Sequence, residues 1–202
     1  YELTENGVKG KRPVMASKII SNVEAEGSPV VITVRSGSYD AAEKESDPTV
    51  DAIDFSFDET DLRITLKEII GASGDKIDLS EAETVIAAGR GAKDEDARKM
   101  IDELADVLGA AIGASRALTE AGIYDPSLQI GQTGKVVSPQ LYIGIGISGA
   151  IQHVAGMANS KVIVAINKDA DAPIFEIADY GLVGDLYDIL PPFIEELKKL
   201  KS

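Results

Sequence analysis

Hydrophobic and polar positions follow two different patterns along this chain. In its first part, apolar and polar residues alternate over residues 50–58 and again over 61–69, so that three apolar side chains share one face of each segment. Residues 29–35 (PVVITVR) form a compact β-branched run. An alternation of period two predicts strands, and no clear helical pattern separates these segments. We therefore expect residues 1–74 to be rich in strands.

From residue 84 onward, short apolar runs alternate with segments of helical period. The apolar runs are rich in Val, Ile and Ala, which favours buried strands. Strands that alternate with helices at this spacing predict a parallel sheet covered on both faces. Strands are expected within residues 84–89, 110–115, 135–148 and 161–167, and helical segments from about residue 94, then within 116–122, 149–157 and 185–200.

Two of these helices have distinctive features. The first is expected to begin at about Asp94, a good N-cap residue, because the apolar residues that follow it share one face. These residues are Ala97, Met100, Ile101, Leu104, Val107 and Leu108. The last helix contains Pro191 and Pro192, and a proline inside a helix removes a backbone donor. We expect that helix to be broken, or to restart, at the two prolines.

The predicted fold class is α/β. Residues 84–202 are expected to form a parallel, doubly wound (Rossmann-like) domain, and residues 75–83 to be a linker, since the sequence around them carries glycines and alternating charge. In such sheets ligands bind at the carboxyl ends of the strands. Several unusual sequences of this chain fall at those ends, so we expect the functional site there.

Composition excludes several function classes. The chain has 202 residues, no cysteine and one histidine, which rules out disulfides, iron–sulfur clusters, thiolate zinc sites and a histidine-cluster metal site within it, so no metal is expected. Its 34 acidic residues outnumber its 20 basic ones, for a formal charge of −14. This balance argues against nucleic acid and anionic membranes as partners and favours proteins with basic patches.

The ends and the apolar runs suggest a compartment. The longest apolar run, residues 141–151, is far shorter than the ~20 residues of a membrane-spanning helix. We see no signal or transit segment at the start, and therefore expect a reducing, soluble compartment. The first residue is Tyr1 and not methionine, which suggests a processed or truncated product.

A glycine motif lies between an apolar run and a helical run. Gly144, Gly146 and Gly149 match the pattern G-x-G-x-x-G, in which backbone N–H groups approach a pyrophosphate at a helix N-terminus. Asp169 provides an acidic residue about 20 positions further on, as dinucleotide-binding folds require. In a segment so rich in glycine, tight packing explains the motif about as well.

Three side chains near the strand ends are candidates for binding. His153, the single histidine, follows the glycine motif, and it is either a half-buried structural residue or a ligand contact. Arg90 and Arg116 each follow a predicted strand. They are either ordinary surface charges or, in so acidic a chain, the two sides of an anion site.

Four motifs occur in order in the second part: GRG (89–91), GASRALTEAG (113–122), QIGQTGKVVSPQLYIGIGISGAIQHVAGM (129–157) and KVIVAINKDADAPIFEIADYGLVGDLYDILP (161–191). Together they closely resemble the C-terminal FAD domain of the electron transfer flavoprotein alpha subunit, from about residue 84 to the C-terminus. Residues 1–74 resemble, less specifically, the final strands of the N-terminal α/β domain of that family. Roughly a hundred residues that precede those strands in the family are not in this sequence, so we expect that first domain to be incomplete.

The resemblance implies an FAD site. In the family, FAD lies extended across this domain, with its isoalloxazine ring toward the subunit interface. Arg90 matches an arginine that reaches the cofactor, and Ser115 with Arg116 matches a pair at the phosphate or flavin edge. Asn167, Asp185 and Leu186 match the adenosine end. The family has a loop whose threonine hydroxyl approaches flavin N5, and this loop is matched by Gln129, Ile130, Gly131, Gln132 and Thr133. It also has a backbone cradle with a histidine near flavin O2, which is matched by Ser148, Gly149, Ala150, Ile151, Gln152 and His153.

The resemblance also implies a function and partners. The chain is expected to be a flavin electron carrier without substrate turnover of its own, in a heterodimer with an electron transfer flavoprotein beta subunit. Its electron donors would be acyl-CoA dehydrogenases of fatty acid β-oxidation or other flavoprotein dehydrogenases. The acceptor would be a quinone oxidoreductase or another membrane or soluble acceptor. The expected compartment is the cytoplasm of a prokaryote or the mitochondrial matrix of a eukaryote.

Two other function classes stay open from the sequence. One is a non-redox nucleotide-binding or assembly module with the same fold, because fold alone does not determine function. The other is an NAD-linked oxidoreductase, suggested by the glycine motif. For the flavin carrier, we expect His153 to titrate near neutrality and to affect the flavin potential mainly at acidic pH.

Overall fold

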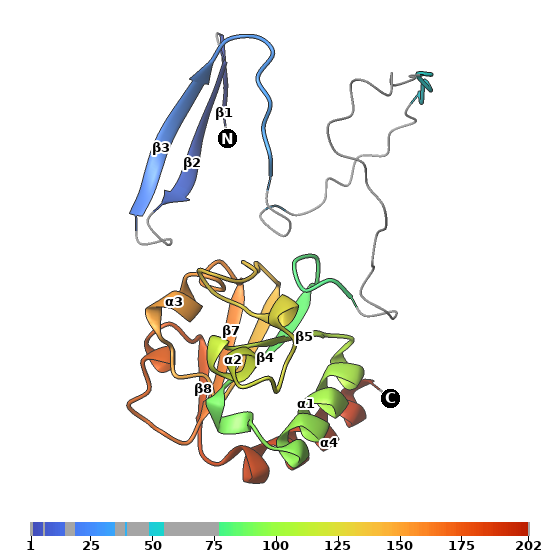
Figure 1. Cartoon of the computed structure of the whole chain (residues 1–202), viewed down its shortest axis with the longest axis vertical. Coiled ribbons are helices and arrows are strands. Elements are labelled where there is room, and N and C mark those ends of the chain that lie inside the picture. Colours follow the sequence, from blue (N-terminus) through green and yellow to red (C-terminus); the bar gives the residue numbers. More distant parts are fainter. Residues whose placement is uncertain are drawn as a thin grey trace. The chain divides into compact units, whose positions relative to one another are not determined.

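A computed structural model of the chain describes residues 2–5, 7–14, 19–34, 39, 49–54 and 77–201 (Figure 1). These residues contain a three-stranded antiparallel sheet near the N-terminus and a five-stranded parallel sheet in the second part of the chain.

The N-terminal sheet has the order β1-β2-β3, with β1 at Glu2–Thr4, β2 at Gly7–Val14 and β3 at Ile19–Glu26. Lys9 on β2 lies opposite Glu24 on β3, and their side chains form an ion pair at 3.3 Å. Large apolar side chains of this sheet are exposed, among them Leu3, Ile19 and Ile20. Among its described residues no side chain is buried, so this sheet has no core of its own.

The strands predicted at 29–35 and 50–58 are not found in the residues described there. Residues 29–34 and 49–54 contain no strand. A strand requires a neighbouring backbone to hydrogen-bond with, and none of the described segments provides one for these residues. The rest of both predicted strands, and the one predicted at 61–69, lie outside the described residues.

The second sheet confirms the predicted α/β class. All its neighbouring strands are parallel, in the order β5-β4-β6-β7-β8. Because the chain passes from β4 to β5 on one side and then to β6 on the other, the sheet has a topological switch point between β4 and β6. The strands are β4 (Thr84–Ala88), β5 (Ala111–Ala114), β6 (Leu141–Ile145), β7 (Val162–Asn167) and β8 (Tyr180–Val183).

Two long helices cover one face of this sheet: α1 (Glu95–Leu108) and α4 (Leu186–Lys201) (Figure 1). The predicted start of α1 is confirmed, because the Asp94 carboxylate accepts a hydrogen bond from the Ala97 backbone N–H at 3.0 Å. The predicted apolar stripe of α1 packs into the core. Gly109 ends this helix in the left-handed conformation, with φ of +65°.

The predicted break in α4 is wrong, because the helix runs through Pro191 and Pro192 without interruption. Both prolines are on the exposed side of the helix. On the opposite side, Leu186, Leu190 and Ile194 are buried against α1 and the sheet. Burying each of these side chains contributes about 1.5–3 kcal/mol, which offsets the roughly 3 kcal/mol cost of an interior proline.

The other face of the sheet is covered by short elements and loops. Ile130, Val137 and Met157 pack there together with Leu79 and Ala82 from the predicted linker. The helix predicted at 149–157 forms over four residues, Ile151–Val154, as α3, and the one at 116–122 forms as α2 (Arg116–Glu120). The 3-10 helices are η1 (Arg90–Ala92), η2 (Pro126–Leu128) and η3 (Pro173–Glu176).

The turns that follow β4 and β6 are in direct backbone contact. The Gly89 N–H donates to the Ile145 carbonyl at 2.8 Å, and a Cβ on Gly89 would overlap the carbonyl oxygen of Gly146. Gly146 itself has φ of +65°, which favours glycine. Packing at the switch point therefore accounts for Gly89 and for one glycine of the predicted motif.

We expect Gly89→Ala to lower the free energy of unfolding by about 3 kcal/mol, because the new methyl group must push the two turns apart. Gly109→Ala is the matched control. It places alanine at a positive φ with no neighbouring atom within 4 Å, and should cost about 1–2 kcal/mol. Urea unfolding of both variants measures the difference, and equal losses would contradict the close-contact explanation.

Candidate functional site

The predicted site residues follow five parallel strands, so they lie along one edge of the sheet. Arg90 follows β4, Ser115 and Arg116 follow β5, and Ser148 follows β6. Asn167 ends β7, and Asp185 and Leu186 come after β8. The carboxyl edge of the sheet therefore carries every segment that the sequence indicated except the loop of residues 129–133.

The 129–133 loop is joined to this edge by backbone contacts. The Ile130 N–H donates to the carbonyl of Ala114, the last residue of β5, at 2.9 Å. The Gln132 N–H donates to the Gln152 carbonyl in α3 at 2.7 Å. Gly131 has φ of +145°, and a Cβ there would press against the same Gln152 carbonyl. The structure thus brings together the two segments expected to face the flavin ring.

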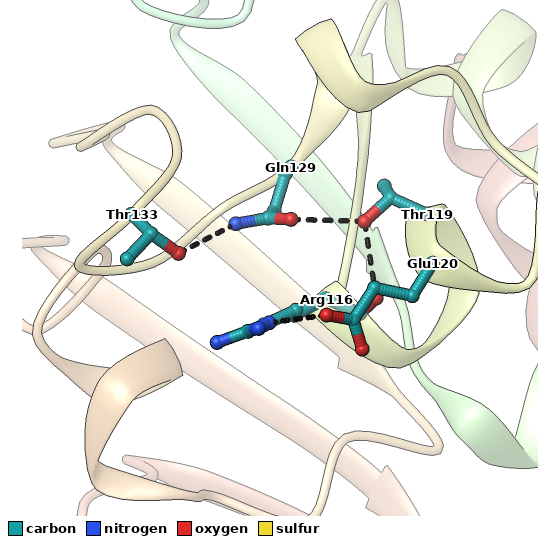
Figure 2. Close-up of polar contacts among 5 residues, drawn as sticks. All are labelled: Arg116, Thr119, Glu120, Gln129 and Thr133. Carbon is teal, nitrogen blue, oxygen red and sulfur yellow. Dashed lines mark hydrogen bonds and ion pairs between the residues drawn. The ribbon is translucent and has the colours of Figure 1, made fainter.

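Side chains of this loop are held by a polar network (Figure 2). Gln129 lies between two threonines: its Oε1 accepts from the Thr119 hydroxyl, and its Nε2 donates to Thr133 Oγ1, both at 2.9 Å. Thr133 then keeps its own hydroxyl proton for another acceptor. In the same view Arg116 Nε donates to the Glu120 carboxylate at 2.7 Å, within α2. Both side chains of this ion pair are exposed, so the pair contributes little to stability.

His153 is buried, with 8% of its surface exposed. Its Nε2 lies 2.7 Å from the hydroxyl of Tyr142 on β6, and its Nδ1 has no hydrogen-bond partner among the described residues. Burial is the larger influence and lowers the pKa of His153 to about 4, and the Ile130 backbone acts in the opposite direction. The imidazole is therefore neutral at physiological pH, unlike the near-neutral titration expected from the sequence.

Two buried polar atoms at this edge lack partners in the described part of the chain: His153 Nδ1 and Ser115 Oγ. Leaving such an atom unpaired costs about 1–3 kcal/mol, and a bound ligand with oxygen or nitrogen acceptors would remove that cost. Arg90 is exposed and has no ion-pair partner among the described residues. These groups fit a large polar ligand that carries negative charge.

Other predicted site residues already have structural partners. Asn167 Nδ2 donates to the Ile147 carbonyl at 2.8 Å, and its Oδ1 accepts from the Asp169 N–H at 3.0 Å. The Asp185 carboxylate accepts from the Tyr187 N–H at 3.1 Å at the start of α4. Leu186, the first residue of α4, is buried in the core. The predicted contacts of these residues with a cofactor stay predictions.

Sequence reasoning missed two residues that support the site: Tyr142 and Thr119. Tyr142 is fully buried in a strand whose other residues are aliphatic or glycine, and such a tyrosine needs a partner for its hydroxyl. Thr119 is buried in a five-residue helix and contacts Gln129. For Tyr142 the available signal was a polar group in an apolar run, whereas the five residues of α2 (RALTE) gave no such signal for Thr119.

The fold and site define a class of protein. An open parallel sheet with close glycine turns, arginines and unpaired buried donors at its carboxyl edge is typical of a nucleotide-binding domain. Residues 78–158 match the sequence family described as the electron transfer flavoprotein FAD-binding domain. This part of the chain belongs to that family, which confirms the resemblance inferred from the sequence.

Relatives are found in bacteria and in mitochondria. The chain is 48% identical to the electron transfer flavoprotein subunit alpha of Bacillus subtilis over 200 residues. The aligned stretch covers 98% of this chain and 61% of the relative. It is 47% identical to the probable mitochondrial alpha subunit of Saccharomyces cerevisiae, over 94% of this chain and 56% of the relative. It is also 48% identical to the electron transfer flavoprotein subunit alpha of Pseudomonas aeruginosa, over 90% of this chain and 58% of the relative. The chain thus spans less than two thirds of the length of these relatives.

In the described part of the chain, none of the helices has the length and apolar character needed to cross a membrane. The predicted domain boundaries and the individual cofactor contacts stay predictions.

The burial of His153 makes stability depend on pH. Its pKa is about 4 in the folded chain and near 6.5 when unfolded, so the unfolded state binds more protons between these values. The stabilisation is complete above pH 6.5 and is lost as the pH falls toward 4. We expect the flavin-free chain to lose about 2 kcal/mol between pH 7 and pH 5.

Urea unfolding at the two pH values measures this loss, and His153→Gln, which cannot titrate, is the control. The chain has a single histidine, so no other imidazole contributes. An equal loss in both proteins would mean that His153 is not buried in the neutral form.

Proposed function

We propose that this chain binds FAD along the carboxyl edge of its parallel sheet and acts as an electron-carrier subunit. The observation that carries the proposal is the pair of unpaired, buried polar atoms, His153 Nδ1 and Ser115 Oγ, in a domain of the FAD-binding family. A cofactor with many acceptor atoms would complete both hydrogen bonds. Bound FAD supplies the redox chemistry, since it accepts and releases electrons one or two at a time.

The chain's residues divide the work of holding FAD. Arg90 and Arg116 supply positive charge in a chain with a formal charge of −14. The close turns at Gly89–Gly91 and Gly146–Gly149 hold Arg90 and Ser148 at the carboxyl edge of the sheet. Thr133, held by Gln129, offers a hydroxyl proton to the flavin. The chain contributes binding and orientation, and no substrate is converted on it.

The proposed partners are an electron transfer flavoprotein beta subunit, flavoprotein dehydrogenases as donors, and a quinone oxidoreductase or another acceptor. The excess of acidic residues supports binding to proteins with basic patches. The exposed Leu3, Ile19 and Ile20 of the N-terminal sheet support its association with further protein. We propose the cytoplasm of a prokaryote or the mitochondrial matrix as the compartment.

The alternative of an NAD-linked oxidoreductase has less support. It rested on the glycine motif, and the contact between Gly89 and Gly146 gives part of that motif a packing role. A non-redox nucleotide module would need groups that bind phosphate but not a buried, unpaired histidine nitrogen.

The absorption spectrum of the purified chain, together with its partner subunit, tests the proposal. We expect a visible flavin spectrum and the release of FAD, rather than FMN, when the protein is denatured. A colourless protein that binds ADP but cannot be reconstituted with FAD would support the non-redox module and overturn the carrier.

Arg116 offers a sharper test of the site. Arg116→Gln removes a positive charge and should weaken FAD binding about tenfold, because a charge-assisted contact is lost. The free energy of unfolding should change by less than about 1 kcal/mol, since the Arg116–Glu120 pair is exposed.

Glu120→Gln is the matched control, because it breaks the same ion pair but keeps the arginine. Its FAD affinity, measured by calorimetric titration, should be unchanged or higher. If both variants weaken binding equally, the ion pair and not the positive charge is what matters.

A further inference from the structure

Tyr142 and His153 form a buried pair between β6 and α3. None of the Tyr142 surface is exposed, and its hydroxyl lies 2.7 Å from His153 Nε2. The two rings are tilted by 58°, with centroids 6.3 Å apart, so they meet through these polar atoms rather than by stacking. Among the described residues, His153 is the only hydrogen-bond partner of the Tyr142 hydroxyl.

The proton in this hydrogen bond can be assigned by counting donors and acceptors. Burial raises the pKa of Tyr142 far above its usual value, so the phenol keeps its proton at any working pH. A buried hydroxyl proton needs an acceptor, and Nε2 is the acceptor within reach. If Nε2 carried a proton itself, the phenol proton would have no acceptor in the described part of the chain. Nε2 is therefore unprotonated.

The second ring nitrogen then carries the imidazole proton. The imidazole is neutral, because burial lowers the pKa of His153 to about 4. No charged side chain among the described residues acts on that pKa; the remaining influence is the Ile130 backbone, which favours a proton on the ring. A neutral imidazole with an unprotonated Nε2 has its proton on Nδ1, the atom that is buried without a partner.

We propose that Tyr142 is a positioning residue that fixes His153 in the Nδ1–H tautomer, so that Nδ1 is a neutral hydrogen-bond donor for an acceptor atom of the bound ligand. The consequence for FAD rests on the proposed function, whereas the tautomer itself does not. A neutral donor of this kind is present unchanged from about pH 5 upward. It adds a hydrogen bond to the ligand without adding a titrating charge.

Nitrogen NMR of the imidazole tests the tautomer directly. The chain has one histidine, so every imidazole signal belongs to His153. In the flavin-free chain we expect Nδ1 to be protonated and Nε2 to be an unprotonated acceptor between pH 5.5 and 8. Finding the proton on Nε2 in the wild-type chain would overturn the proposal, whatever the variants do.

Tyr142→Phe tests the part played by the hydroxyl. Without it, both tautomers should become populated and the titration midpoint of His153 should rise, because a bond that favours the neutral form is lost. Tyr124→Phe is the matched control, since it removes another buried hydroxyl, one that has no partner among the described residues. An unchanged tautomer in Tyr142→Phe would show that another group, such as the Ile130 backbone, fixes the ring. If Tyr142→Phe does not fold, the wild-type spectrum still decides the tautomer.

FAD affinity tests the consequence. Tyr142→Phe should weaken FAD binding several-fold, and up to about tenfold if the donor is lost entirely, whereas Tyr124→Phe should not. His153→Asn keeps an amide donor near the position of Nδ1 and should bind FAD more tightly than His153→Gln, whose amide reaches toward Nε2. Equal affinity in these two variants would contradict a donor at Nδ1. If the wild-type chain binds no FAD at all, the proposed function fails, but the tautomer is still decided by NMR.

Discussion

The contact between the turns after β4 and β6 is the constraint on which the site depends. These strands are neighbours at the switch point of the sheet, and the hydrogen bond from Gly89 to Ile145 continues their pairing beyond the last strand residues. No side chain fits between the turns, because a Cβ on Gly89 would overlap Gly146. Beyond this contact the two segments separate: the one after β4 continues to Arg90, and the one after β6 continues to Ser148. In sheets of this kind ligands bind at the carboxyl ends of the strands, which is where both turns lie.

A second layer is built on this contact by buried polar groups. The loop after β5 and the helix after β6 are joined where Gln132 donates to Gln152, and their side chains are held by Thr119 and Tyr142. Holding neutral groups in buried positions fixes which atoms donate and which accept before any ligand arrives. The unpaired Nδ1 of His153 is a cost to the flavin-free chain.

The second part of the chain could largely be predicted from its sequence. Its strands are short apolar runs between turn residues, and Asp94 marks the start of α1 clearly. The prolines of α4 misled the prediction, since local propensity gave way to the burial of Leu190 and Ile194. In the first part, β-branched residues at 29–34 predicted a strand, but a strand depends on a partner that a single segment cannot specify.

The candidate site was predictable in position more than in chemistry. Strand ends and glycines indicated the edge of the sheet, and the resemblance assigned residues to FAD. The partners of those residues could not be predicted: Glu120 beside Arg116 follows a helical spacing, but Tyr142 beside His153 depends on how α3 packs over β6. The charge state of His153 could not be predicted either, because it depends on how deeply the packing buries the imidazole. Burial lowers the pKa of this side chain below the usual value for histidine.

A crystal structure of the FAD complex would test the central claim most directly. The claim is that the unpaired donors at the carboxyl edge of the sheet are completed by the cofactor. The account predicts FAD along that edge, with acceptor atoms within hydrogen-bond distance of His153 Nδ1 and Ser115 Oγ, and with the Tyr142–His153 bond intact. FAD bound elsewhere, with both atoms still buried and unpaired, would contradict it.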